Sequence, residues 1–301
     1  MGDHVETDTT LAVVVQHRGE IVAEAYADGV TVESTLISWS MAKSITHALV
    51  GMAQMDGLLD IQAPTGIALW RDDDRRLITL QHLLEMRSGL AWIEDYVEGN
   101  ASDVIEMLFG SGKEDHAKHA MTQPLACMPG SEWYYSSGTT NIVARLLGDA
   151  LGDKNGSKDK THAFIQKRLF DSIGMKSAIA QFDAAGTFVG SSYVYATARD
   201  FARFGELYLR DGLWEGKRIL PSGWVDHARA QTVIDDETGQ GYGAHWWTQP
   251  GEPGSLIASG YEGQQIFVLP ERDLVIVRLG KTISDKRDAV RAGLYEIAQM
   301  F

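Results

Sequence analysis

Runs of apolar residues near both ends of the chain predict β-strands. Two runs near the start, 11–16 and 21–26, are rich in β-branched and apolar residues and flank the polar tetrapeptide at 17–20, which is typical of a hairpin. Later in the chain, four more runs are expected to be strands: 242–248, 255–261, 264–269 and 274–279. We therefore expect one sheet that is built from both ends of the chain.

The middle of the chain has helical periodicity instead. Apolar residues recur at close to helical spacing from Met41 to Met55, which predicts a helix that Gly57 ends. Further helices are expected at 78–86, 141–151, 163–170 and 197–211, from Pro221, and at about 285–300. This pattern predicts an α/β lobe from residues 1–60 and 181–301, with a mainly helical lobe from residues 61–180 inserted between them.

The segment 94–130 stands out within the helical region. It has turn signals at 99–100 and 110–112 and a charged run at 113–116. Connections of this length in a compact protein are usually functional lids or disordered segments. We therefore expect this segment to act as a lid.

The charge balance narrows the classes of function. The 301 residues include 27 lysines and arginines against 41 aspartates and glutamates, a net charge of −14. Such an acidic chain is unsuited to nucleic acid or to an anionic membrane surface. A single cysteine, Cys127, excludes an internal disulfide and any multi-cysteine metal site. No signal peptide and no apolar run of about 20 residues is present, so we expect a cytoplasmic protein.

The first chemical motif is Ser40-Met41-Ala42-Lys43, an S-x-x-K element at the start of a predicted helix. Residues three apart lie on one helix face, so the lysine can approach the serine hydroxyl. A lysine in an apolar site has a lowered pKa and can take the serine's proton, which makes the serine a nucleophile. The same pattern at Ser157 and Lys160 lies in a polar loop with no apolar helix behind it, and we regard it as coincidental.

Two further motifs are ambiguous when each is considered alone. Trp133-Tyr134-Tyr135-Ser136-Ser137 precedes a predicted helix, and a tyrosine near a lysine can shuttle a proton, although the run also fits an aromatic core cluster. Ser259-Gly260-Tyr261-Glu262-Gly263-Gln264 enters a predicted strand. Its glycines would let a substrate approach backbone N–H groups, although the same residues fit a simple hairpin turn.

In this order and spacing, the three motifs resemble the penicillin-recognising serine hydrolase superfamily. That group includes class C β-lactamases, DD-peptidases, related esterases and 6-aminohexanoate-oligomer hydrolases, and its pattern is S-x-x-K, then Y-x-N or Y-x-S, then K-T-G or H-x-G. The resemblance extends to residues 83–90 and 263–270 and covers nearly the whole chain. It implies a β-lactamase/DD-peptidase-like α/β (α+β) fold, with an antiparallel sheet flanked by helices and an inserted helical lobe.

The resemblance also implies roles for individual residues. Ser40 would be the acylated nucleophile, Lys43 its base, and Tyr135 the group that protonates the leaving group and later activates water. Ser137 would fill the last position of Y-x-S, and the N–H groups of Ser40 and Gln264 would form the oxyanion hole beside the third motif, Tyr261-Glu262-Gly263. The neighbouring register, Tyr134-Tyr135-Ser136, also reads Y-x-S, but the family's aromatic-x-Tyr-Ser run favours Tyr135.

Two departures from the family pattern bear on the substrate. Ser137 replaces the asparagine of β-lactamases, and Tyr261-Glu262-Gly263 lacks the cation that receives a β-lactam carboxylate; Glu262 adds an anion instead. Both departures favour the esterase and 6-aminohexanoate-oligomer hydrolase branch. Tyr96 resembles a lid tyrosine of that branch that contacts substrate, although it also fits an exposed loop aromatic.

We therefore predict a serine hydrolase, without metal or cofactor, that acts on small carboxylic esters or short amides as a monomer or homodimer. A β-lactamase or D-amino-acid peptidase is the alternative within enzymes, and a catalytically silent ligand-binding relative is the alternative outside them. His116-x-x-His119 beside Glu114 could suggest a metal site, but it has too few neighbouring ligands and fits a solvated loop.

Overall fold

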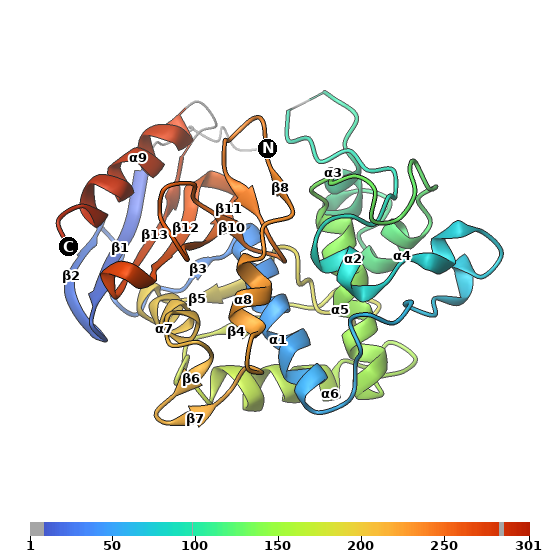
Figure 1. Cartoon of the computed structure of the whole chain (residues 1–301), viewed down its shortest axis with the longest axis horizontal. Coiled ribbons are helices and arrows are strands. Elements are labelled where there is room, and N and C mark those ends of the chain that lie inside the picture. Colours follow the sequence, from blue (N-terminus) through green and yellow to red (C-terminus); the bar gives the residue numbers. More distant parts are fainter. Residues whose placement is uncertain (1–8, 98, 283–285) are drawn as a thin grey trace.

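An antiparallel sheet of eight strands combines both ends of the chain, as the sequence predicts (Figure 1). The computed structural model describes residues 9–97, 99–282 and 286–301. The strand order is β2-β1-β13-β12-β11-β10-β9-β8, and each neighbouring pair is antiparallel. The strands are β1 (Thr9–His17), β2 (Glu20–Tyr26), β8 (Val233–Ile234), β9 (Gly241–Tyr242), β10 (Trp247–Thr248), β11 (Leu256–Gly260), β12 (Gln264–Leu269) and β13 (Leu274–Lys281).

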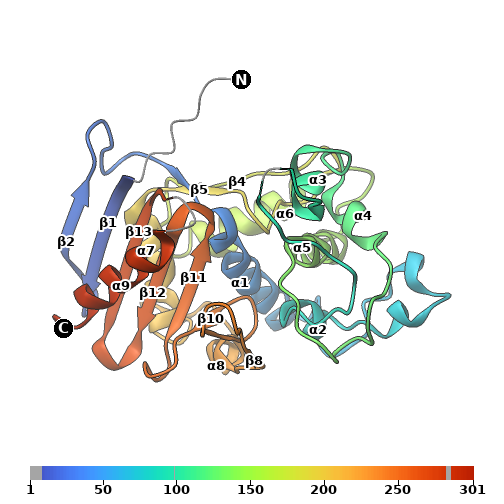
Figure 2. The same ribbon diagram turned by 90° about the horizontal axis from the view of Figure 1, so that it is seen from above.

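Helices cover both faces of this sheet. Helix α7 (Ala198–Leu209) packs against β1, β12 and β13 on one face, and α9 (Arg287–Ala298) covers the other, as Figure 2 shows from above. Successive strand residues point to opposite faces, so Val275 and Val277 join the main core while Leu274 and Ile276 pack with α9. The burial of β13 on both faces explains why its sequence is a continuous apolar run.

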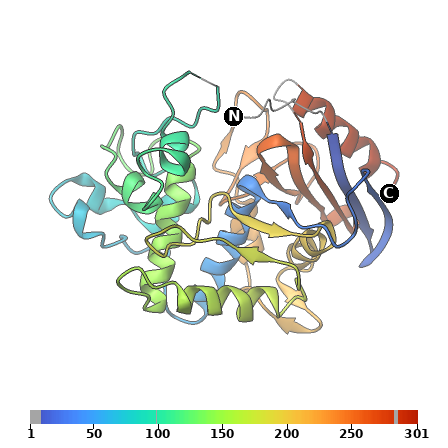
Figure 3. The same ribbon diagram turned by 180° about the vertical axis from the view of Figure 1, so that it is seen from behind.

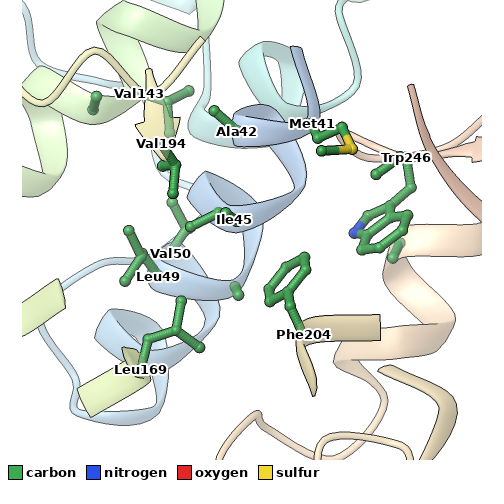
Figure 4. Packing of buried hydrophobic residues seen from close by; sticks show 14 of the residues in the cluster. Met41, Ala42, Ile45, Leu49, Val50, Val143, Leu169, Val194, Phe204 and Trp246 are labelled. Carbon is green, nitrogen blue, oxygen red and sulfur yellow. The ribbon is translucent and has the colours of Figure 1, made fainter. Parts of the chain in front are cut away.

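Helix α1 (Ala42–Met55) lies at the centre of the molecule. Twelve consecutive residues, 42–53, are buried, because sheet-side elements contact one side of the helix and α5 (Ser137–Leu151) contacts the other. Figure 4 shows Val143 and Leu169 on one side of α1 and Phe204 and Trp246 on the other. Because α1 is fixed on all sides, its N-terminus is held rigidly between the edge of the sheet and the helical region.

The helical region and the smaller elements complete the fold. Figure 3 shows the yellow-green helix α6 and its continuation η4 running along the lower edge of the molecule towards the β6–β7 hairpin. None of the described helices is long and apolar enough to cross a bilayer. The remaining elements are β3 (Leu36–Ile37), β4 (Ile179–Ala180), β5 (Val194–Ala196), β6 (Leu213–Trp214), β7 (Lys217–Arg218), α2 (Leu80–Leu84), α3 (Asp103–Phe109), α4 (His116–Met121), α6 (Asp159–Phe164), η4 (Ile165–Phe170), α8 (Trp224–Arg229), and the 3₁₀ turns η1 (Trp39–Met41), η2 (Ala68–Trp70), η3 (Asp74–Leu77), η5 (Tyr261–Gly263) and η6 (Pro270–Arg272).

The structure differs from the predicted strand at 242–248. Only β9 and β10 are extended there, and a turn in which His245 has a φ of +55° separates them. A methyl group on Gly243 would lie 2.1 Å from the carbonyl oxygen of Ala228, so the backbone is pressed against the end of α8. This close approach depends on a distant segment, and the local sequence does not reveal it.

Helix boundaries also differ from the predictions. The helix expected at 78–86 extends only from Leu80 to Leu84, because Thr79 caps its start and Met86 has a φ of +58°. Helix α5 begins at Ser137, four residues early, because the Ser136 hydroxyl accepts the N–H of Thr139.

Three other expected elements can be compared with the structure. The helix expected from Pro221 begins after Gly223. The segment 94–130 contains α3 and α4 rather than one long loop. The expected start of the last helix, residue 285, lies outside the described residues, and α9 begins at Arg287.

Candidate active site

Ser40 and Lys43 lie at the entrance to the buried helix α1. Ser40 is in the 3₁₀ turn η1, after Trp39, whose φ of +43° is uncommon for a residue with a side chain. The chain leaves Trp39 and turns directly into the helix, so Ser40 stays half-exposed while Lys43 is 2% exposed. The Nζ of Lys43 is 2.9 Å from the Oγ of Ser40. The S-x-x-K spacing therefore brings these two groups into hydrogen-bond contact.

The Lys43 ammonium group is surrounded by oxygen atoms. Its Nζ donates to the Oγ of Ser40 and the Oγ of Ser137, each at 2.9 Å, and to the carbonyl of Ser191 at 3.2 Å. Burial lowers the pKa of Lys43 to about 8, although the negative charge of Glu94 acts in the opposite direction. The lowered pKa makes the neutral form of Lys43, which can accept the proton of Ser40, accessible near neutral pH.

Tyr135 lies against the same lysine. The centre of its ring is 4.8 Å from the Nζ of Lys43, and the ring stacks on Trp247 with centroids 5.7 Å apart. Burial raises the pKa of Tyr135, and the charge of Glu94 adds to this effect, so the phenol is protonated at neutral pH. Tyr134 is exposed, and its N–H donates to the carbonyl of Met86. The geometry thus favours the register in which Tyr135 is the tyrosine of Y-x-S.

Glu94 is a member of this cluster that the sequence analysis missed. Its Oε1 accepts the hydroxyl of Ser137 at 2.5 Å and that of Tyr96 at 2.7 Å. Its Oε2 accepts the backbone N–H of Ser137 at 2.8 Å and the indole N–H of Trp92 at 2.6 Å. Ser137 therefore links the two charged groups, because its hydroxyl contacts both the ammonium group of Lys43 and the carboxylate of Glu94. A single glutamate in a polar segment carries no local signal of this role.

The third motif faces the first across aromatic contacts. Tyr261 packs edge-on against Trp39 at 5.7 Å between ring centroids and stacks on Tyr96 at 5.1 Å. The carboxylate of Glu262 accepts the indole N–H of Trp39 at 3.1 Å. Tyr96, Tyr261 and Glu262 therefore lie together beside the residue that precedes Ser40.

Gln264 begins β12, a strand that contacts η1, and Gly263 comes directly before it. The side-chain amide of Gln264 donates to the carbonyl of Gly280 at 2.6 Å and accepts the N–H of Gly280 at 2.9 Å, which ties this residue to β13. A methyl group on Gly263 would lie 2.8 Å from the guanidinium of Arg278, also on the β13 side. A methyl group on Gly260 would lie 3.1 Å from the Cβ of Gln264, and the same methyl group would lie 3.2 Å from the backbone nitrogen of Ser40, so Gln264 lies near Ser40.

Gly260, at the end of β11, is the glycine that approaches the nucleophile. A methyl group on Gly260 would lie 2.5 Å from the carbonyl oxygen of Ser38 and 3.2 Å from the backbone nitrogen of Ser40. The position thus requires glycine for a close approach of two backbones. The sequence predicts a close approach at the glycines of this motif, and Gly260 is the one at which the two backbones meet.

The other candidates lie in structural settings. The hydroxyl of Ser157 donates to Asp153, and the Nζ of Lys160 donates to the carbonyl of Gly152, so this second S-x-x-K element organises a loop. His116 is buried with its Nδ1 3.9 Å from Asp183. Over the described ranges there is no group of three side chains that could hold a metal ion.

Comparisons with known proteins identify the family. The sequence matches the Beta-lactamase family over residues 6–298. It is 25% identical over 296 residues to a 6-aminohexanoate-dimer hydrolase of Paenarthrobacter ureafaciens, a match that covers 91% of this chain and 73% of that protein.

Solved structures show the same fold. A Bacillus anthracis protein, provisionally described as a 6-aminohexanoate-dimer hydrolase, superposes with a TM-score of 0.84 at 25% identity over 97% of this chain and 80% of its own. A D-stereospecific amidohydrolase of Streptomyces shares the fold with a TM-score of 0.69 at 16% identity, over 93% of each chain. The chain therefore belongs to the Beta-lactamase family and is a serine hydrolase with a β-lactamase-like fold.

Proposed function

We propose that this enzyme hydrolyses short amides and small carboxylic esters through an acyl-enzyme on Ser40. The observation that carries the proposal is the hydrogen-bonded series Ser40 Oγ, Lys43 Nζ and Ser137 Oγ, with a pKa of about 8 for the lysine. A buried amine that is partly neutral and touches a half-exposed hydroxyl is suited to activating that hydroxyl.

The groups present suffice for acyl transfer to water. Neutral Lys43 takes the Ser40 proton as Oγ forms a bond to the carbonyl carbon. When the bond to the leaving amine or alcohol breaks, protonated Tyr135 supplies a proton to that leaving group, and the proton on Lys43 replaces it. A water molecule then attacks the acyl-enzyme and gives a proton to neutral Lys43, and this proton passes to the Oγ of Ser40 as its bond to the acyl carbon breaks, which releases the acid.

The oxyanion of the tetrahedral intermediate needs backbone donors close to Ser40. In our proposal, these are the N–H of Ser40 and an N–H at the Gly260 end of β11, where the two backbones approach most closely. The backbone N–H of Gln264 is the other candidate for the second donor, while the side-chain amide of Gln264 holds the turn through Tyr261 and Gly280.

The third motif supports a substrate without a carboxylate next to the scissile bond. Where a β-lactam carboxylate would need a cation, Tyr261 offers an aromatic ring and Glu262 a negative charge near Trp39. The relationship at 25% identity to a 6-aminohexanoate-dimer hydrolase supports a linear amide as one substrate. A β-lactam is therefore expected to be a poor substrate.

The proposal can be tested with three substrates and two serine variants. Wild-type enzyme should hydrolyse p-nitrophenyl butyrate and the linear 6-aminohexanoate dimer far faster than nitrocefin. Ser40→Ala should abolish turnover and labelling by a fluorophosphonate, whereas the matched variant Ser157→Ala should keep both. Equal labelling of wild type and Ser40→Ala would overturn the assignment of the nucleophile, and nitrocefin turnover as fast as ester turnover would favour a β-lactamase.

A further inference from the structure

A second cavity lies away from the catalytic residues. It has a volume of about 580 Å³, is open to solvent and is bordered by the β1–β2 hairpin, helix α7 and the β6–β7 hairpin. Figure 1 shows α7 and the β6–β7 hairpin below the sheet, on the side away from α2–α5. None of the residues that line it belongs to the network around Ser40. Its volume is in the range of cavities that bind small organic molecules.

Three arginines from one face of α7 line this cavity, but they differ in their partners. Arg199 makes two hydrogen bonds to the carboxylate of Glu24, at 2.9 and 2.5 Å. Arg210 lies 2.7 Å from Glu206 and 2.7 Å from Asp273. Both guanidinium groups are therefore already neutralised by bonded carboxylates.

Arg203 lies between them along the chain, and its guanidinium N–H groups are available to a ligand. Its nearest carboxylate is that of Asp200, 3.5 Å from Nε, and it donates no hydrogen bond to any residue in the described ranges. Its side chain is 48% exposed and lines the cavity. A guanidinium group in this state can bind a carboxylate through two parallel hydrogen bonds.

Part of the cavity wall is apolar. Ile21 and Leu213 are 42% and 39% exposed, and Trp214 also lines the cavity. A ligand with a hydrocarbon part would remove these apolar surfaces from water, which favours its binding.

Two carboxylates at the cavity limit the charge of the ligand. Glu206 is occupied, because its oxygens accept the amide of Gln16 and the guanidinium of Arg210. Glu215 also lines the cavity. Together with the net charge of −14, these groups disfavour a polyanion and favour a ligand with one negative charge.

We propose that this cavity binds a small amphipathic monocarboxylate. Arg203 holds the carboxylate, and Ile21, Leu213 and Trp214 contact the hydrocarbon part. The site is independent of the reaction proposed for Ser40, so either assignment can fail without the other.

The test is a calorimetric titration of the whole chain with octanoate, beside octanamide, which has the same chain but no charge. Saturable octanoate binding is expected, at least tenfold tighter than that of octanamide. Arg203→Gln should weaken octanoate binding at least tenfold and leave octanamide binding unchanged. Arg71→Gln, which alters an exposed arginine elsewhere, should change neither.

Three outcomes would overturn the proposal. The first is the absence of saturable octanoate binding, and the second is equal octanoate binding by wild type and Arg203→Gln. The third is loss of octanoate binding when Ser40 is blocked with a fluorophosphonate, because that result would place octanoate in the catalytic site. A second variant, Trp214→Ala, should weaken binding of octanoate and octanamide alike, because it removes apolar contact and leaves Arg203 in place.

Discussion

The charge state of one residue, Lys43, governs how this site can work. Burial favours the neutral amine, which the proposed reaction needs, while Glu94 favours the ammonium ion. The pairing of Ser40 with Lys43 could be predicted because three-residue spacing at a helix start fixes it locally. The role of Glu94 could not be predicted, because only tertiary folding brings its segment to Ser137.

The pH dependence of the reaction follows from this balance. Because Lys43 must be neutral to accept a proton, kcat/KM for p-nitrophenyl butyrate should rise with pH and level off above an apparent pKa near 8. Glu94→Gln removes the charge that stabilises the ammonium ion, so the pKa of Lys43 should fall and the rising limb should move to lower pH by about one unit. The measurement is a pH–rate profile from pH 5.5 to 9.5.

Glu262→Gln is the control for this profile. This variant removes a carboxylate that bonds to Trp39 and does not contact Lys43. The rising limb of its pH–rate profile should therefore coincide with that of the wild type. A limb that stays in place in Glu94→Gln would show that Lys43 is not the group that titrates.

Tyr135 should matter most where the leaving group needs a proton. Its raised pKa keeps the phenol protonated, so Tyr135→Phe should lower amide turnover by about 10²–10⁴-fold. p-Nitrophenolate leaves without protonation, so the loss with the p-nitrophenyl ester should be smaller. Steady-state rates on both substrates measure this difference, with exposed Tyr134→Phe as the control. Equal losses on the two substrates would argue against proton donation by Tyr135.

At the scale of elements, the end of β11 and the turn η1 must fit closely. Gly260→Ala would place a methyl group 2.5 Å from the carbonyl oxygen of Ser38, so one of the two backbones must move. A displacement of about 1 Å at the nucleophile can lower the rate by about 100-fold. We expect a loss of that size in kcat for p-nitrophenyl butyrate.

Gly293→Ala is the matched control for this variant. A methyl group on Gly293, in α9, would meet no atom within 4 Å, and alanine favours a helix over glycine. Its kcat should equal that of the wild type. Unchanged activity in Gly260→Ala would show that the approach of β11 does not position Ser40.

The elements were predictable where periodicity is long or the strand is central. An unbroken apolar pattern marks the hairpin at 11–26, the strands β12 and β13 and the helix α1. The observed ends of these elements lie within a few residues of the predicted ends. The run 242–248 has the composition of a strand, but packing of Gly243 against Ala228 turns the chain. Contacts between distant segments therefore decide what local patterns leave open.

At the scale of the whole molecule, the site joins the sheet to the helical region. The turn at His245 connects several helices, because its carbonyl accepts the hydroxyl of Ser44, its Nε2 lies 3.0 Å from the hydroxyl of Thr140, and its N–H donates to the carbonyl of Leu84. The stack of Tyr96 on Tyr261 makes a second connection, beside Ser40. The first connection is buried and the second is partly exposed, so the two should affect the enzyme differently.

A substitution in the core should therefore lower mainly the stability of the protein, and a substitution in the aromatic stack should lower mainly its activity. Leu49→Ala removes a fully buried side chain of α1 and should lower the free energy of unfolding by about 2–5 kcal/mol, with kcat/KM at 20 °C near the wild-type value. Tyr261→Ala removes the exposed contacts to Tyr96 and Trp39 and should cost about 1 kcal/mol of stability. Its kcat/KM should fall about tenfold, because the segment around Tyr96 and the third motif no longer contact and position each other. Urea unfolding and steady-state kinetics on both variants measure the two effects, and a Tyr261→Ala enzyme with full activity would show that the stack has no part in positioning the substrate.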